Sequence, residues 1–131
     1  MNLQQLQNTA IAVRRDIVRM VAAVNSGHPG GSLGCTDLLV ALYFDVMKLK
    51  RNADGKPVFD MDGRDEDLFF LSNGHISPVF YSALARAGYF PIAELSTFRK
   101  LDSRLQGHPT DRKSTRLNSS HSTLSRMPSS A

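Results

Sequence analysis

The sequence has only one cysteine, Cys35, among its 131 residues. An internal disulfide and a cysteine-rich metal cluster are therefore excluded, and we expect Cys35 to be a small buried residue. No apolar run reaches transmembrane length, and the N-terminal residues lack the basic start and apolar run of a secretory signal. These absences predict a cytoplasmic protein that makes no contact with a membrane.

Several catalytic signatures are also missing. Without a GxSxG motif a Ser-His-Asp hydrolase has little support, and without HxH, HExxH or paired Cys/His spacing a histidine-bound metal is disfavoured. The glycines match neither GxGxxG after a strand nor GxxxxGK[ST], which disfavours simple nucleotide folds. An acidic run over residues 60–67 lacks the spacing of a calcium loop, so it predicts a solvated loop.

The net charge of +4 and the pI near 9.6 would be compatible with a nucleic-acid partner. The distribution of the charge along the chain weakens that interpretation. Residues 111–131 carry a net charge of +3, which leaves only +1 for residues 1–110. No aromatic residue accompanies the basic residues of this segment, and aromatic stacking is the usual complement of a single-strand-binding surface. A non-catalytic module that binds nucleic acid through residues 111–131 therefore remains a disfavoured alternative.

The composition changes after Thr110. Residues 111–131 contain nine Ser or Thr and only four apolar side chains, without helical or strand periodicity. Such a segment buries too little surface to fold. We therefore expect a partial domain over residues 1–110 and a disordered, non-native tail over residues 111–131, with a native flexible tail as the alternative.

Hydrophobic periodicity predicts four helical segments. Apolar residues in steps of three and four indicate an amphipathic helix from Leu3 to Val24, ended by Asn25 and the glycines that follow. After a glycine-rich turn, three further segments are expected to be helical: residues 36–47, residues 78–87 with Ser77 as N-cap and Gly88 as stop, and a short helix near residues 91–98.

One strand is predicted. The run "LFFLS", Leu68 to Ser72, is apolar without alternation, as in a strand buried on both faces of a parallel sheet. The fold class expected is α/β: an incomplete piece of a parallel sheet flanked by helices, mostly helical, with this single strand.

Three of the four histidines directly follow a glycine: His28 in "NSGHPGGSLG", His75 in "SNGHIS" and His108 in "LQGHPT". Glycine frees the backbone and allows close approach to a ligand, so these imidazoles are expected to be presented rather than buried. His75 follows the predicted strand and precedes a helix, which is where open α/β sheets bind ligands and where a helix N-terminus favours an anion.

The segments "SGHPGGSLGCTDLLVALYF", "DLFFLSNGHISPVFYSAL" and "LQGHPT" resemble successive signatures of the N-terminal half of transketolase, in order from about residue 3 to Thr110. The resemblance implies a transferase of the pentose phosphate pathway that moves a two-carbon ketol unit from a ketose phosphate to an aldose phosphate. It also implies thiamine diphosphate and a divalent metal, Mg or Ca, as cofactors, and a thiamine-diphosphate-binding fold.

The resemblance gives the three histidines separate roles. His28 matches a catalytic histidine beside the reacting carbon of the donor sugar, where it transfers protons and hydrogen-bonds hydroxyls. His75 matches a cofactor-binding histidine that contacts the diphosphate. His108 matches a third, catalytic histidine near the terminal hydroxyl of the donor. The chemistry of bond cleavage would belong to the cofactor.

The sequence departs from the family after "GHP". The glycine-rich segment and the Gly-Asp-Gly motif with a downstream Asn, which hold the metal and the diphosphate, are absent. We therefore expect a fragment truncated after about residue 110, without metal ligands and inactive alone. It would need a C-terminal transketolase half or subunit, in a homodimer or heterotetramer.

Two other thiamine-diphosphate ketol transferases remain as alternatives within the superfamily. One is a dihydroxyacetone synthase, and the other is a deoxyxylulose-phosphate synthase. The histidine context "LSNGHISP" argues against the second.

Overall fold

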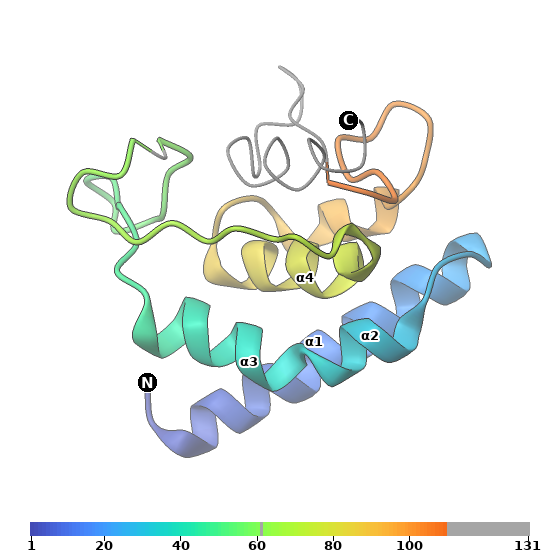
Figure 1. Ribbon diagram of the computed structural model, residues 1–131, viewed down its shortest axis with the longest axis horizontal. Helices are drawn as coiled ribbons and strands as arrows, with labels where there is room; N and C mark the ends of the chain where they lie inside the picture. Colours follow the sequence, from blue (N-terminus) through green and yellow to red (C-terminus); the bar gives the residue numbers. More distant parts are fainter. Residues whose placement is uncertain (61, 110–131) are drawn as a thin grey trace.

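A computed structural model describes residues 1–60 and 62–109 of the chain. The tail predicted over residues 111–131, with its basic charge, lies outside the described residues. Within them, no helix is long and apolar enough to cross a membrane. The elements run in the order α1 (Leu3–Val24), α2 (Pro29–Gly34), α3 (Thr36–Ala41), the π-helical turn η1 (Leu42–Val46), the 3₁₀ turn η2 (Gly74–Ile76), α4 (Ser77–Ala87) and the 3₁₀ helix η3 (Ile92–Thr97) (Figure 1).

Helix α1 has the bounds that the sequence predicts. Its N-terminus is closed by a capping box, in which the Asn2 side chain accepts from the Gln5 N–H and the Gln5 side chain accepts from the Asn2 N–H. Asn25 ends it in the left-handed conformation, with φ of 49°. The apolar stripe faces inward and buries Ala10, Val13, Ile17 and Met20.

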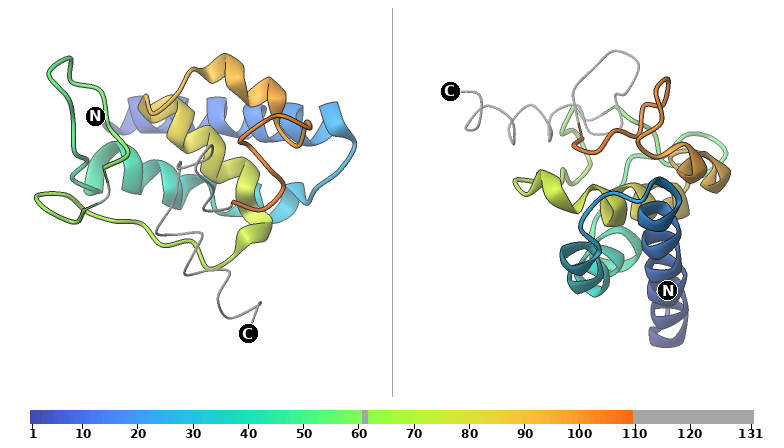
Figure 2. Two further views of the ribbon diagram at one scale, coloured as in Figure 1. Left: turned by 90° about the horizontal axis from the view of Figure 1, so that it is seen from above. Right: turned by 90° about the vertical axis from the view of Figure 1, so that its right-hand side faces the viewer.

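Helix α4 is the centre of the molecule. It contacts α1, α2, α3 and η3, and Figures 1 and 2 show it lying between α1 to α3 on one side and residues 92–109 on the other. All its residues from Ser77 to Ala85 are buried, and burial of its large side chains, such as Phe80, contributes roughly 1.5–3 kcal/mol each. Gly88 ends it with φ of 108°, a conformation that favours glycine.

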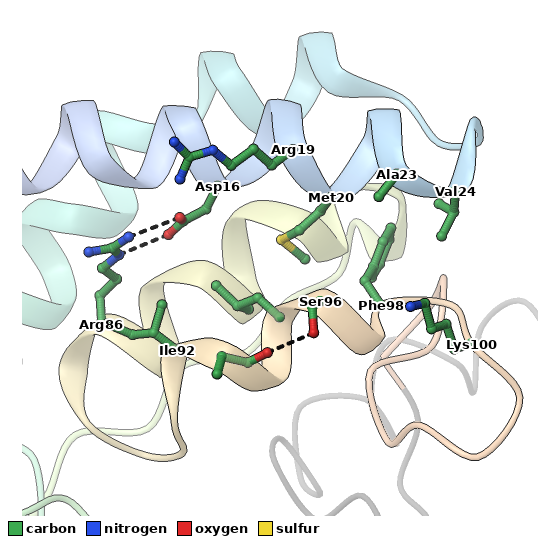
Figure 3. A pocket seen from close by; sticks show the side chains of 12 residues that line it. Asp16, Arg19, Met20, Ala23, Val24, Arg86, Ile92, Ser96, Phe98 and Lys100 are labelled. Carbon is green, nitrogen blue, oxygen red and sulfur yellow. Dashed lines mark hydrogen bonds and ion pairs between the residues drawn. The ribbon is translucent and has the colours of Figure 1, made fainter.

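A buried ion pair joins α1 to α4. Arg86 donates two hydrogen bonds to Asp16, of 2.8 and 2.9 Å (Figure 3). The Ser82 hydroxyl donates a third, of 2.7 Å. Asp16 is only 6% exposed, so its carboxylate has exchanged water for these three donors. This carboxylate raises the pKa of Arg86 above its usual value, chiefly through the hydrogen bonds.

Two local predictions were wrong, and a third was confirmed in part. The glycine-rich turn is in fact helix α2, because Pro29 fixes the backbone of a first helical position and only Gly27, with φ of 116°, needs positive φ. The helix expected over residues 36–47 is confirmed over residues 36–46, where α3 is followed directly by the π-helical turn η1. Ser77 is the first residue of α4 rather than its N-cap, since its hydroxyl donates to the Gly107 carbonyl instead.

The strand predicted over Leu68–Ser72 is not confirmed. Among the described residues the backbone pairs as β-structure only in an isolated bridge between Arg51 and Pro57. Leu71 is buried and Phe69 packs against the same core. The apolar side chains of this segment therefore contribute to the core, although its backbone forms no β-ladder. A strand of a parallel sheet requires a neighbouring strand, and residues 1–60 and 62–109 contain none.

Candidate functional site

The structure brings the three glycine-preceded histidines together. The ring centroids of His28 and His75 are 5.9 Å apart, and those of His75 and His108 are 4.9 Å apart, both edge to face. The three side chains come from the start of α2, from η2 and from the loop after η3, and all three residues are exposed. They form one surface group, the histidine cluster.

His28 is positioned by the packing of α2 on α4. Ser32 is fully buried, and its hydroxyl accepts a hydrogen bond of 3.3 Å from the Val79 N–H. That N–H lies in the first turn of α4, where helix donors have no partner within the helix. A methyl group on Gly31 would lie 3.0 Å from the Ile76 side chain, so the two elements are in close contact. Small residues in α2 thus fix the distance from His28 to η2.

His75 occupies the 3₁₀ turn before α4. The Asn73 side chain accepts a hydrogen bond of 3.2 Å from the backbone N–H of His75 and so holds the start of this turn. Gly74 lies against His108, and a Cβ at this position would come within 2.8 Å of His108 Cδ2. The glycine therefore allows the close approach of the two rings.

His108 belongs to a loop that α4 anchors. The Ser77 hydroxyl donates to the Gly107 carbonyl at 2.6 Å, and the Tyr81 hydroxyl donates to the Gln106 carbonyl at 2.7 Å. Burial raises the pKa of Tyr81 far above its usual value, so this hydroxyl stays protonated and remains a donor. Two hydrogen bonds from one helix face thus fix the backbone just before His108.

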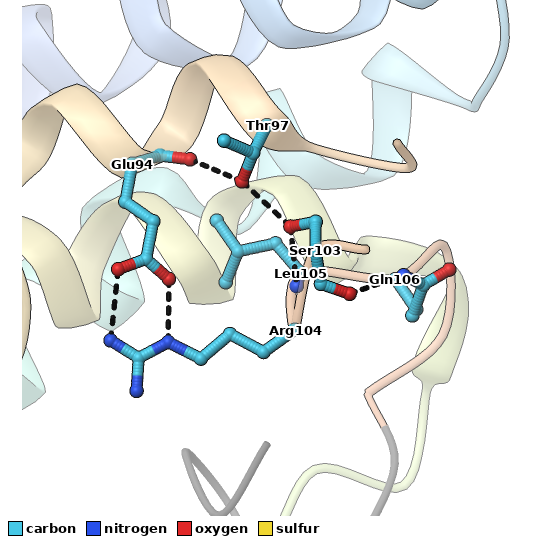
Figure 4. A network of polar contacts seen from close by, with 6 residues as sticks. All are labelled: Glu94, Thr97, Ser103, Arg104, Leu105 and Gln106. Carbon is cyan, nitrogen blue, oxygen red and sulfur yellow. Dashed lines mark hydrogen bonds and ion pairs between the residues drawn. The ribbon is translucent and has the colours of Figure 1, made fainter. Parts of the chain in front are cut away.

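A second network holds the same loop to η3 (Figure 4). Arg104 binds both carboxylate oxygens of Glu94, and the Thr97 and Ser103 hydroxyls lie 2.6 Å apart. Ser103 also accepts from the Leu105 N–H at 2.9 Å, and the Leu105 side chain is fully buried. The loop is therefore fixed from both sides, with His108 at its exposed end.

The electrostatics of the histidine cluster favour neutral His108. Partial burial lowers the pKa of His108 below its usual value, and the neighbouring charges of His75, Arg99 and His28 lower it further. Near neutral pH this imidazole is therefore uncharged, with one nitrogen able to donate a hydrogen bond and the other able to accept one.

The imidazoles of the histidine cluster are available to a ligand. Within the described part of the chain, none of the three rings makes a side-chain hydrogen bond. No group of three or more His, Cys, Asp or Glu side chains among these residues is arranged to hold a metal ion. The cluster can therefore bind hydroxyls or an anion and exchange protons with them.

The match of a protein-family model shows the family of this chain. The model described as the transketolase thiamine diphosphate binding domain matches residues 5–124. The chain belongs to the transketolase family. A transketolase from Pongo abelii is 36% identical over 107 residues, covering 82% of this chain and 16% of that protein. One subunit of the apulose-4-phosphate transketolase of Actinobacillus succinogenes is 36% identical over 114 residues, covering 86% of this chain and 39% of its relative.

The solved structure of transketolase from Leishmania mexicana matches with a TM-score of 0.67 and 34% identity. The match covers 81% of this chain and 15% of that one. The chain thus spans about one sixth of the length of the full transketolases it matches. The transketolase resemblance predicted from the three histidine segments is confirmed.

The sequence singled out the three histidines as candidate site residues, but it did not indicate the residues that position them. Ser32, Ser77 and Tyr81 make their contacts with residues 25 to 47 positions away. No local pattern marks such pairs. The small residues beside His28 and His75 are the one local feature that indicates close packing at these positions. They do not show which distant residues pack there.

Proposed function

We propose that this chain supplies the histidine side of a transketolase site, which binds thiamine diphosphate and a donor ketose phosphate and transfers a two-carbon ketol unit to an aldose phosphate. The observation that carries the proposal is the convergence of His28, His75 and His108, at centroid distances of 5.9 and 4.9 Å, in a chain of this family.

The histidine cluster fits thiamine diphosphate in its donor chemistry. Three exposed imidazoles with no side-chain hydrogen bonds among the described residues offer N–H groups to an anion. His75, between Asn73 and α4, would donate to the diphosphate. When bound, the cofactor supplies the electron sink for cleavage of the ketose carbon–carbon bond. A divalent metal, Mg or Ca, would accompany the diphosphate, with its ligands outside residues 1–109.

The other two histidines would act on the sugar. His28 would hydrogen-bond the donor hydroxyls and move a proton at its ring nitrogen. His108, kept neutral by its lowered pKa, would bind the terminal hydroxyl of the donor as donor or acceptor. Ser77 and Tyr81 would act only as positioning residues for this loop, because their hydroxyls bond to backbone carbonyls.

A complete site needs more than this chain. One of its relatives is named as a transketolase subunit, and the remainder of a transketolase, as a C-terminal half or separate subunit, would supply the rest of the pocket. A homodimer or heterotetramer of the pentose phosphate pathway enzyme would be the active form. We propose that the 131-residue chain is inactive without these parts.

Turnover of a chimaera tests the proposal. Residues 5–109 of this chain would replace the matching segment of the Pongo abelii transketolase, and steady-state ketol transfer would be measured with saturating cofactor. His28→Ala should lower kcat at least about 100-fold, as expected for loss of a proton-transferring group, whereas Lys56→Ala, in an exposed loop, should leave it unchanged. An active chimaera that tolerates His28→Ala refutes the role of His28.

A further inference from the structure

A cavity of about 380 Å³ lies between α1, α4 and η3, away from the histidine cluster. None of the three histidines lines it. Its volume is within the range of small-molecule sites, which are mostly apolar with a few polar groups that orient the ligand. Its lining has that character, with Met20, Val24, Leu95 and Phe98 among the apolar residues.

The charged residues at the cavity are predominantly cationic. Arg19, Arg86 and Lys100 line it together with a single acid, Asp16. Asp16 is already neutralised by its two hydrogen bonds from Arg86. Among the described residues, Arg19 and Lys100 make no ion pair, so their charges are available.

The close-up view shows how these groups are arranged (Figure 3). Arg19 lies near the Asp16–Arg86 pair, Lys100 lies at the opposite end beside Phe98, and the Met20 side chain projects between them. An apolar lining between two unpaired cations can hold the apolar body of a small molecule whose single anionic head pairs with one of the two cations.

We propose that this cavity binds small organic anions with an aliphatic body, of the class of medium-chain carboxylates. The aliphatic part would pack on Met20 and Phe98, and Lys100 or Arg19 would pair with the carboxylate. The proposal is independent of ketol transfer, because the cavity and the histidine cluster share no residue.

The test is a titration of the 131-residue chain with octanoate, followed by NMR of ¹³C-labelled methionine methyl groups. The Met20 methyl, buried at 4% exposure against the cavity, should shift in a saturable way while the Met1 methyl does not. Octanamide, of the same shape without the charge, should bind about tenfold more weakly.

Variants locate the site. Arg19→Ala or Lys100→Ala, whichever removes the cation that pairs with the carboxylate, should weaken octanoate binding about threefold to fivefold, as for an exposed charge pair. Ala23→Leu, which fills the cavity from α1, should abolish binding. Lys56→Ala is the matched control, because it removes an exposed lysine that does not line the cavity, and it should have no effect. Far-UV circular dichroism checks that each variant is folded.

Each other outcome overturns the proposal. It is wrong if the Met20 methyl shows no saturable shift, if octanamide binds as tightly as octanoate, or if neither Arg19→Ala nor Lys100→Ala weakens binding. It is also wrong if the chain self-associates and Ala23→Leu disrupts the association, since a second copy would then occupy the cavity.

Discussion

Arg86 on α4 binds both carboxylate oxygens of Asp16 on α1, at 2.8 and 2.9 Å, across 70 residues of sequence. Because Ser82 donates a third hydrogen bond, the carboxylate is satisfied inside the core. The pair fixes the relative position of α1 and α4, the two longest helices among the described residues, and α4 carries the residues that anchor the histidine cluster.

Asp16→Asn should therefore destabilise the chain. The amide cannot accept both hydrogen bonds from Arg86, which is left partly buried without its counter-charge. The expected loss in the free energy of unfolding is about 2–3 kcal/mol, somewhat below the usual cost for fully buried pairs because Arg86 retains some exposure. Urea denaturation followed by circular dichroism measures it.

Asp37→Asn is the control for this prediction. Asp37 pairs with Arg14 at 3.0 Å, but its side chain is 77% exposed. An exposed pair contributes at most about 1 kcal/mol. If the two variants lose the same free energy of unfolding, the Asp16–Arg86 contact stabilises the chain no more than an exposed ion pair does.

Gly74→Ala should disturb the histidine cluster without unfolding the chain. The new methyl group would lie 2.8 Å from His108 Cδ2, so the His108 ring must move. Because His108 is exposed, this movement should cost little stability, but the nuclear Overhauser contact between the His75 and His108 rings should weaken. Gly30→Ala, where a methyl group meets nothing within 4 Å, should leave that contact intact. A preserved contact in Gly74→Ala would mean that the two rings are not in close contact.

Stability should fall as the pH drops below the ordinary histidine range. The folded-state pKa of His108 is lowered, so the unfolded chain binds this proton more readily. The resulting stabilisation is complete above the unfolded pKa of about 6.5 and is lost as the pH falls through the folded value. Comparison of thermal melts of the parent and His108→Asn between pH 5 and 8 should show a weaker pH dependence in the variant.

An NMR titration separates the causes of this shift. The His108 midpoint should lie below 6.5, and His75→Asn should raise it only in part, because burial is the larger cause. A midpoint at or above the ordinary value would contradict the description of the cluster.

Some elements could be predicted because their determinants are local. The bounds of α1 follow from its apolar period and from Asn25, and α4 ends at Gly88 as its sequence indicates. The Asp16–Arg86 pair could not be predicted, since nothing near either residue marks the other. The run from Leu68 to Ser72 is apolar as expected, but pairing into a strand depends on neighbours that the described residues do not contain.

The sequence indicated which three histidines are candidate site residues, but it did not indicate that their rings lie next to one another. The glycine before each of His28, His75 and His108 indicated that all three imidazoles are presented to a ligand. Their convergence depends on Ser32, Ser77 and Tyr81, whose partners are distant in sequence. The sequence therefore singled out three candidate residues, and tertiary packing determines how they meet.

The isolated chain should neither catalyse ketol transfer nor bind thiamine diphosphate measurably. Catalysis needs the charge, metal and ring of the cofactor to be held together, and a misplacement of about 1 Å can cost 100-fold in rate. Among the described residues no group of three or more His, Cys, Asp or Glu side chains is arranged to hold a metal ion. Calorimetry with thiamine diphosphate and Mg²⁺ should give an unchanged Tm, because a ligand stabilises only a fold that binds it. A saturable rise in Tm would show that this chain already forms a working cofactor site.

The affinity of the chimaera for thiamine diphosphate tests the central claim most directly. His75→Ala should raise the apparent Kd of the cofactor at least about tenfold, because it would remove the proposed hydrogen bond to the charged diphosphate. His28→Ala should change that Kd less than about threefold, no more than the loss of one weak contact, because the proposal assigns His28 to the sugar and not to the cofactor. If the chimaera binds the cofactor and the two variants alter its Kd equally, or if His75→Ala leaves it unchanged, the assignment of the histidine cluster to the cofactor and the donor sugar is wrong.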